Sequence, residues 1–305
     1  MAEQMTVSAA APQVATPQTR GRAGMSLTRL AWQRFRRHQM ALVGGVVLLV
    51  IMAISAAAPF LAAEDAANKV NPLNIRSSPS PAHPFGTDDV GRDMLWRTIY
   101  GGRISLAIGT LSVLIAMTLG VAIGCLSGFY GGVADAVLMR FTDAVLSIPS
   151  LFLLIILTRV FGPTVPAIIL VIGLLNWMQV SRIVRANFLS LKERDFVLAA
   201  RSIGVNDGAI ILRHVLPNTL APVIVAATLG IGHAIILEAS ASFLGLGVQP
   251  PTASWGSTLY RAQEVMVMAP WVAIFPGLMI LVTVLCINFL GDGLRDALDP
   301  HVRGR

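Results

Sequence analysis

Long apolar runs that lack Asp, Glu, Lys and Arg recur through most of this sequence. A helix needs about 20 consecutive, mostly apolar residues to cross the hydrocarbon core of a bilayer, and most of the runs meet that requirement. The third of the predicted spans has Arg140 and Asp143 in its first turn, so the pattern does not fix its inner boundary. The pattern predicts an all-α integral membrane protein with six transmembrane helices, near residues 40–62, 104–127, 137–158, 164–181, 218–246 and 270–290.

The charged residues support this interpretation and predict an orientation. Only 13% of the residues are charged and the mean hydropathy is +0.71, whereas a soluble domain carries about 25% charged residues. The net charge of +7 would ordinarily suggest nucleic acid as a partner. However, sixteen of the 23 basic residues fall in segments on one side of the predicted spans. Because Lys and Arg accumulate on the cytoplasmic side, we expect a multi-pass protein of the cytoplasmic (inner) membrane with both termini inside, surrounded by lipid and not bound to nucleic acid.

The chain divides into five predicted segments. Residues 1–25 are rich in Ala, Pro, Gln and Thr without apolar periodicity, which is typical of a disordered tail. The first apolar stretch begins at Met40, behind a basic run, and is long enough for an uncleaved span rather than a signal peptide. The outer segment is interpreted either as a solvated loop or as a contact for another protein. The remaining predicted segments are 26–62 with the first span, 63–101 outside, 102–291 as the transmembrane domain with the loop 193–218, and 292–305 as a cytoplasmic tail.

Several kinds of catalytic chemistry are missing from the sequence. A phosphate-binding loop needs a lysine in GxxxxGK[ST], and neither Lys69 nor Lys192 follows a glycine. HExxH and GxSxG motifs are also absent. The five histidines have no ligand spacing, and Cys125 and Cys286 both fall within predicted spans, where we interpret them as packing residues. We therefore expect no cofactor, no metal site and no enzymatic activity in this chain, so that a partner supplies the energy if the process is driven.

The loop between the fourth and fifth spans carries its own helical pattern. Apolar residues recur at Phe196, Ala200 and Ile203, with charged residues on the opposite face. Asp195 is a candidate N-cap, and Gly204 suits the left-handed conformation that ends many helices. A second short helix is predicted from about residue 207 to residue 217. From periodicity alone, the first helix is equally well interpreted as an interfacial helix on the lipid headgroups or as a docking element.

Here the residues carry a family resemblance. The pattern Ala199-Ala200-x3-Gly204 followed by Leu216-Pro217 resembles the EAA loop of permease subunits of ABC importers. The resemblance is greatest to the second permease of the dipeptide, oligopeptide and nickel group, and it runs from about residue 26 to residue 303. Other matching stretches, in chain order, are His83-Pro84-Phe85-Gly86-Thr87-Asp88, Gly91-Arg92-Asp93, Arg213-His214-Val215-Leu216-Pro217-Asn218, Phe243-Leu244-Gly245-Leu246-Gly247, Pro250-Pro251, Ser254-Trp255-Gly256 and Gly291-Asp292-Gly293-Leu294-Arg295-Asp296.

The resemblance implies a fold, partners and a mechanism. It implies the type I ABC importer permease fold, in which the cytoplasmic loop forms a coupling helix that docks on an ATPase. It also implies a homologous permease as heterodimer partner, two cytoplasmic ATPase subunits and an extracytoplasmic substrate-binding protein. Transport of a peptide or related small solute would then follow from alternating access. The residues that the resemblance assigns to ATPase coupling are Asp195, Ala199, Ala200, Arg201, Gly204, His214, Leu216 and Pro217.

Two positions qualify this assignment. The family usually has Glu where this chain has Leu198, so the capping or charge that a Glu would supply is missing here. Glu238 is the only carboxylate well inside a predicted span, which makes it a candidate for the translocation pathway. At about 1.5 Å per residue it lies near the outer end of its helix. It is interpreted either as a pathway or gate residue or as a structural hydrogen-bonding group.

Smaller features concern packing. Gly120, Gly124 and Gly128 form a small-residue face that lets two helices approach closely, within the bundle or at a dimer seam. Pro149 predicts a kink in the third span. Trp255 and Trp271 flank the last outer loop and are interpreted as interfacial anchors.

The main alternative function is a stand-alone secondary transporter. Such proteins usually contain paired repeats and several ionisable residues near the midplane, and neither feature is found here. A membrane-embedded enzyme is a remote third reading, because the sequence has no catalytic constellation. The cargo is not specified by the sequence: dipeptides, longer peptides, glutathione and nickel chelates are all used within the resembling group.

Overall fold

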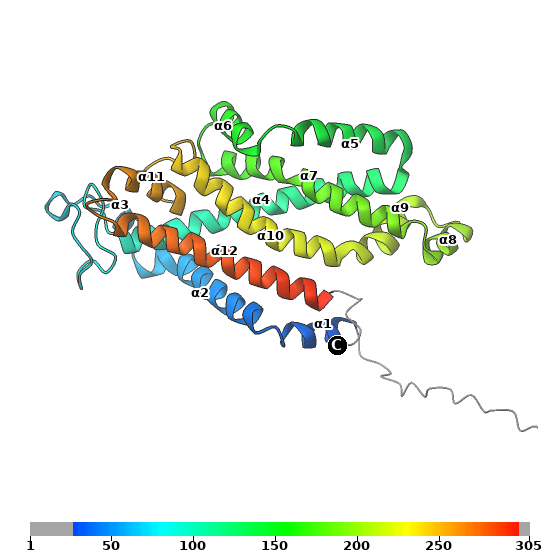
Figure 1. The fold of residues 1–305 in the computed structure, drawn as a ribbon, viewed down its shortest axis with the longest axis horizontal. Coiled ribbons are helices and arrows are strands. Elements are labelled where there is room, and N and C mark those ends of the chain that lie inside the picture. Colours follow the sequence, from blue (N-terminus) through cyan, green and yellow to red (C-terminus); the bar gives the residue numbers. More distant parts are fainter. Residues whose placement is uncertain (1–26, 299–305) are drawn as a thin grey trace, which may run out of the picture.

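The computed structural model describes residues 27–298, and between them it contains helices and one isolated β-bridge, Thr87 with Asp93. The expectations for residues 1–25 and for the basic residues of the last seven positions lie outside the described residues. The long helices run side by side along the length of the molecule (Figure 1). In chain order the elements are α1 Leu27–Phe35, α2 Gln39–Leu61, α3 Asp65–Asn68, η1 Pro72–Asn74, α4 Met94–Tyr130, α5 Gly132–Leu146, α6 Ser150–Phe161, α7 Val165–Leu191, α8 Asp195–Ser202, α9 Asp207–Ala209, η2 Ile210–Val215, α10 Leu216–Phe243, α11 Trp255–Val265 and α12 Trp271–Leu298.

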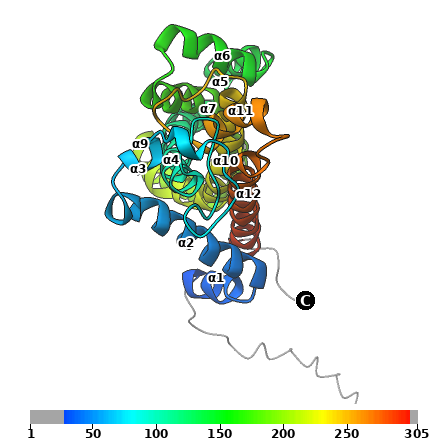
Figure 2. The same ribbon diagram turned by 90° about the vertical axis from the view of Figure 1, so that its left-hand side faces the viewer.

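Five of these helices, α2, α4, α7, α10 and α12, are long and apolar enough to span a membrane, and a sixth span results if α5 and α6 are counted together. The prediction of an all-α protein with about six spans is therefore confirmed. Viewed along the long axis, α4, α7 and α10 lie in the middle of the bundle (Figure 2). α2 and α12 lie on one side of them, with α1 beyond, and α5 and α6 lie on the other.

The closest helix pair, α4 and α7, is built on glycines. A Cβ added at Gly124 would lie 2.6 Å from the carbonyl oxygen of Ser181 and 2.7 Å from Cβ of Val184. Gly120 and Gly128 meet α7 in the same way, at Val180 and Phe188. The small-residue face is therefore an intramolecular packing surface, and the dimer-seam alternative does not describe it.

Replacing Gly124 with alanine is expected to lower stability by about 1–3 kcal/mol, because an overpacked seam must shift backbone as well as side chains. Gly45→Ala is the matched control, since its added Cβ would meet only Cδ1 of Leu290, at 3.6 Å. The measurement is the thermal unfolding midpoint of the purified chain in detergent. Equal midpoints for the two variants would show that the seam has room for a methyl group.

The third predicted span is broken. α5 and α6 meet at an angle of 88°, and Pro149 occupies the N-cap of α6 between them. A single helix over 137–158 is therefore a wrong prediction, although the proline marks the break, because its ring and missing N–H disfavour a continuous helix. Two ion pairs hold α5 against the C-terminal half of α7: Arg182 contacts Asp143, and Nη2 of Arg185 lies 2.6 Å from Oδ2 of Asp135.

Two helix boundaries also differ from the predictions. α4 begins at Met94, inside the predicted outer segment 63–101, and α12 continues to Leu298, inside the predicted tail 292–305. Both predicted spans were ended at charged residues, whereas the helices continue through these residues. Arg97 is nevertheless only 2% exposed, because its Nη1 donates to the carbonyl oxygen of Ala67 and to Oδ1 of Asn68.

The loop before α4 is held in shape by buried charges. Asp88 and Arg92 are 1% and 6% exposed, and Nε of Arg92 donates to Oδ2 of Asp88 over 2.7 Å. A longer contact joins this loop to α11, where Nη1 of Arg261 lies 3.3 Å from Oδ2 of Asp89. A solvated loop does not describe this part of the segment, while contact with a binding protein stays a prediction.

Candidate coupling surface and membrane-embedded polar sites

The helix in the loop between α7 and α10, α8, begins and ends at well-defined positions. The N-cap is Arg194, which makes no side-chain capping bond, so the prediction of Asp195 as N-cap is wrong. Asp195 is the first helical residue, where its charge favours the helix dipole. At the other end Gly204 has φ +81°. Its N–H donates to Arg201, and the N–H of Val205 donates to Ala200, the bonding pattern of a Schellman motif.

α8 turns one apolar face to the bundle and another to solvent. Val197 and Ala200 are buried in a cluster with Phe188, Ile210 and Val215, which come from α7 and the segment before α10. The predicted apolar face of Phe196, Ala200 and Ile203 is therefore wrong as a single face, because Ala200 is buried while the other two are exposed. Phe196 is 40% and Ile203 80% exposed, and Ala199 lies exposed between them at helical spacing. We call Phe196, Ala199 and Ile203 the exposed stripe of α8. It lies on the surface of the chain instead of in its core.

The remaining coupling candidates are spread around α8 and not gathered at one point. The guanidinium of Arg201 stacks over the ring of Phe129 at the end of α4, 5.1 Å from its centroid. The second short helix that the sequence predicts is continuous with α10 through six residues of π-helix, Ile210–Val215. His214 lies in that segment, and Leu216 and Pro217 open α10. The wider π turn lies directly before Pro217, which has no N–H to donate and whose ring crowds the preceding turn.

Glu238 is the centre of a hydrogen-bonded hub near the C-terminal end of α10. Its side chain is 0% exposed, and its carboxylate accepts bonds from the hydroxyls of Ser242 at 2.6 Å, Ser254 at 2.8 Å and Ser105 at 3.4 Å. Each serine oxygen in turn accepts a backbone N–H, from Val248, Ser257 and Trp255 respectively. The hub therefore joins α4, α10 and the start of α11. This geometry favours the structural alternative that the sequence leaves open.

Trp255 is also part of this outer packing. It is 0% exposed, and its indole Nε1 donates to the carbonyl oxygen of Thr98 over 2.9 Å. The prediction of an interfacial anchor is wrong for Trp255, because its ring lies between α11 and α4. Trp271 is half-buried and donates from Nε1 to the carbonyl oxygen of Thr87, so it fastens the outer loop to α12.

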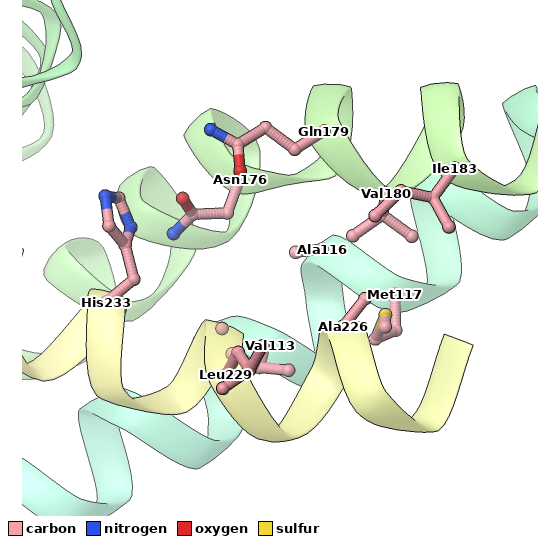
Figure 3. A pocket seen from close by; sticks show the side chains of 11 residues that line it. Val113, Ala116, Met117, Asn176, Gln179, Val180, Ile183, Ala226, Leu229 and His233 are labelled. Atoms are coloured by element: carbon pink, nitrogen blue, oxygen red, sulfur yellow. The ribbon is translucent and has the colours of Figure 1, made fainter. Parts of the chain in front are cut away.

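A cavity of about 240 Å³ opens in the middle of the bundle surface, between α4, α7 and α10. Asn176, Gln179 and His233 supply its polar side chains. Figure 3 shows these three gathered at one end, with Met117 and Ala226 at the other. Sequence reasoning missed this group because it followed formal charges, and uncharged amides and a lone histidine leave the apolar runs uninterrupted. An intramembrane amide pair at i and i+3 is the signal that identifies it.

The face that carries this cavity differs from the rest of the bundle surface. On α2 the exposed side chains are apolar, among them Val43, Val46 and Leu49, which suits contact with lipid. Polar side chains at the centre of a bilayer are costly unless they face water or other protein groups. The face with Gln179 and His233 is therefore the one that does not suit lipid, as expected for a surface lining a pathway or a protein partner.

Comparison with protein families gives two matches. Residues 120–304 match the family described as "Binding-protein-dependent transport system inner membrane component". Residues 26–79 match the "N-terminal TM domain of oligopeptide transport permease C". Together the matches cover most of the chain, including α7, α8 and α10, whereas α4 is matched only from residue 120 onward.

Individual relatives and solved structures agree with these matches. The chain is 42% identical to the glutathione transport system permease protein GsiD of Pectobacterium atrosepticum, over 89% of this chain and 90% of that one. It is 40% identical to the dipeptide transport system permease protein DppC of Alkalihalophilus pseudofirmus, over 90% of each chain. Among solved structures, an inward-facing MetNI methionine ABC transporter matches with a TM-score of 0.53 and 23% identity, over 68% of this chain and 98% of that chain. The last match shows the fold.

Proposed function

The chain belongs to the family of inner membrane components of binding-protein-dependent transport systems, and from that premise we propose that it forms one half of a peptide pathway driven by partner ATPases. It is a permease subunit of an ABC importer and a multi-pass protein of the inner membrane. Membership in this family argues against the stand-alone secondary transporter. ATPase and binding-protein partners follow from the family. A homologous permease as heterodimer partner, with both termini in the cytoplasm, is our proposal.

The proposed cargo is a short peptide. The similar permeases carry glutathione and dipeptides in their names, and both are small peptides with exposed main-chain amides and a free carboxylate. The pathway is proposed to run along the polar face of α4, α7 and α10, because that face carries Asn176, Gln179 and His233 and does not suit lipid. Alternating access would open this face first outward and then inward.

The proposal that α8 couples the permease to the ATPase rests on the exposed stripe of α8. An apolar stripe on a helix of eight residues fits a groove on another protein. The buried side of α8 packs against the ends of α7 and the start of α10, so a push on α8 would reach the spans that line the cavity. Asp195, Arg201, His214, Leu216 and Pro217 would then shape and support this contact. Leu198, which is 49% exposed beside the stripe, would add apolar area where the family usually has a charge.

The test is to place a charge on the stripe. Ile203→Asp is expected to reduce the amount of ATPase that co-purifies with the permease about fivefold, since burying an unpaired charge at an interface costs more than 1 kcal/mol. Val70→Asp is the matched control, because Val70 is also an exposed β-branched residue, at 56%, but lies in the outer loop. Binding of ATPase at the parent level by the Ile203 variant would instead favour an interfacial helix on lipid headgroups. Loss of ATPase with Val70→Asp alone would reverse the proposed orientation.

A further inference from the structure

The cavity described above lies at the same depth on three helices. Its lining residues occupy the central third of each span: Val113, Ala116 and Met117 of α4, Asn176 and Gln179 of α7, and Leu229 and His233 of α10. They recur at helical spacings of three and four, so each helix contributes one stripe. A solute that moves along the polar face from one side of the membrane to the other therefore passes this cavity midway.

The three polar side chains of the cavity make no hydrogen bond to the residues that the structure describes. Nδ2 of Asn176 is buried and makes no hydrogen bond to any described residue. Among residues 27–298, the side chains of Gln179 and His233 also make no hydrogen bond within the chain. By contrast, the equally polar Glu238 has three serine donors. Gln179 and His233 are exposed where they line the cavity, whereas buried polar groups in proteins are almost always satisfied. The buried amide of Asn176 without a partner therefore indicates a ligand that enters the cavity.

We propose that this cavity is a transient binding site for one or two residues of a passing peptide, whose main-chain groups bond to Asn176, Gln179 and His233. This inference rests on the proposed function. The side chain of the peptide would occupy the apolar end, which Met117, Val180 and Leu229 line. Met117 can adapt to side chains of different shape, because its unbranched thioether has several rotatable bonds. A site of this kind selects for the peptide bond and tolerates many side chains.

The chemistry of the cavity favours a peptide over other occupants. Two amides and an imidazole offer both donors and acceptors, which matches the N–H and C=O groups of a peptide bond. No Asp, Glu, Lys or Arg lines the cavity, so it lacks the carboxylates that a calcium or magnesium ion prefers and the counter-charge for tight binding of a charged group. Weak binding suits a pathway, since a solute held tightly at midpoint would not leave.

The size of the cavity sets the length of the occupant. Its volume of about 240 Å³ lies below the roughly 300–1,000 Å³ of pockets that enclose a drug-sized ligand. The cavity is open at the surface of this chain. The cavity therefore holds a short piece of peptide at a time. A side chain of the partner permease is the competing occupant, and it would make these residues interface contacts.

The experiment uses proteoliposomes that hold the complete importer: both permeases, the ATPases and the binding protein. The probe is a dipeptide of alanine and photo-leucine, whose diazirine labels nearby side chains on illumination. We expect label on α4 and α10 between residues 113 and 117 and between 226 and 233. Asn176→Ala is expected to reduce both this label and the uptake rate about fivefold, the effect of losing one ordinary hydrogen bond, while all subunits still co-purify. Thr228→Val is the matched control, because its hydroxyl bonds to its own helix at Ile224 and does not line the cavity.

Each outcome separates the hypotheses. Label and uptake that do not differ between Asn176→Ala and Thr228→Val, with the parent importer active, would overturn the binding site and leave the proposed function intact. Loss of the partner permease from the Asn176→Ala complex would make the group an interface and would also overturn the site. Failure of the parent importer to take up the dipeptide at all would instead refute the proposed peptide cargo.

Discussion

Replacing Gly204 with valine is expected to reduce uptake to less than about one tenth of the parent rate, while the chain still inserts into the membrane. Gly204 ends α8 with φ +81°, and a Cβ placed there would meet nothing within 4 Å. The penalty is therefore purely conformational. A left-handed residue other than glycine costs roughly 1–2 kcal/mol, and more when the side chain is β-branched.

A valine at position 204 would avoid this penalty if the backbone left the left-handed conformation, and the helix cap would then be broken. The two bonds of the Schellman motif, from Gly204 to Arg201 and from Val205 to Ala200, would then be lost. Ile203, the most exposed residue of the stripe at 80%, lies directly before the cap and would be displaced first. The buried side of α8 would remain in place, because Val197 and Ala200 are held by the core cluster. Insertion and folding should consequently be unaffected while coupling fails.

Gly204→Asn is the matched control for conformation. Like valine, asparagine adds a side chain at this open site. It nevertheless adopts the left-handed region more readily than other non-glycine residues. We expect its uptake to remain close to the parent rate. The measurement is uptake of a labelled dipeptide by proteoliposomes that contain the full importer, together with the amount of permease inserted. If both variants lost uptake equally, the bulk of the side chain and not the backbone conformation would be the cause. If both kept the parent uptake rate, a coupling role for the end of α8 would be contradicted.

Replacing Glu238 with alanine is expected to lower stability by about 3 kcal/mol. The substitution opens a cavity and leaves the hydroxyls of Ser105, Ser242 and Ser254 without their acceptor, and both effects are costly in a buried site. The damage would extend to the segment between α10 and α11, because these serines also bind its backbone. The outer end of the bundle should become the first part to open.

Glu238→Gln tests whether this position requires a negative charge or only a side chain that hydrogen-bonds to the three serines. The amide keeps the volume and one acceptor oxygen, and the serine hydroxyls can rotate to accept from its NH2 group. We expect it to cost about 1 kcal/mol and to support uptake. The measurement pairs the thermal unfolding midpoint of the purified complex with the uptake rate. An Ala variant that keeps its midpoint but loses uptake would restore the pathway alternative for this residue.

The two residues on which these predictions rest were visible in the sequence to different degrees. Gly204 could be assigned a left-handed helix end from its place in an amphipathic pattern, since that rule is local. Glu238 could be noticed as an intramembrane carboxylate, but its three serines are 133, 4 and 16 residues away in the chain. Their convergence depends on how α4, α10 and α11 pack. Arg97 and Trp255 were misjudged for the same reason, since their burial comes from partners distant in sequence.

The sequence by itself determined that the chain is a helical membrane protein with about six spans and that it resembles the importer permeases, because hydropathy and short motifs act within one segment at a time. The tertiary structure decided everything that depends on two segments meeting. It set the 88° angle between α5 and α6, left Phe196 and Ile203 exposed while it buried Ala200, and brought Asn176, Gln179 and His233 to one cavity. These outcomes follow from packing, in which a residue is buried, exposed or left without a partner only relative to helices that its own segment cannot specify.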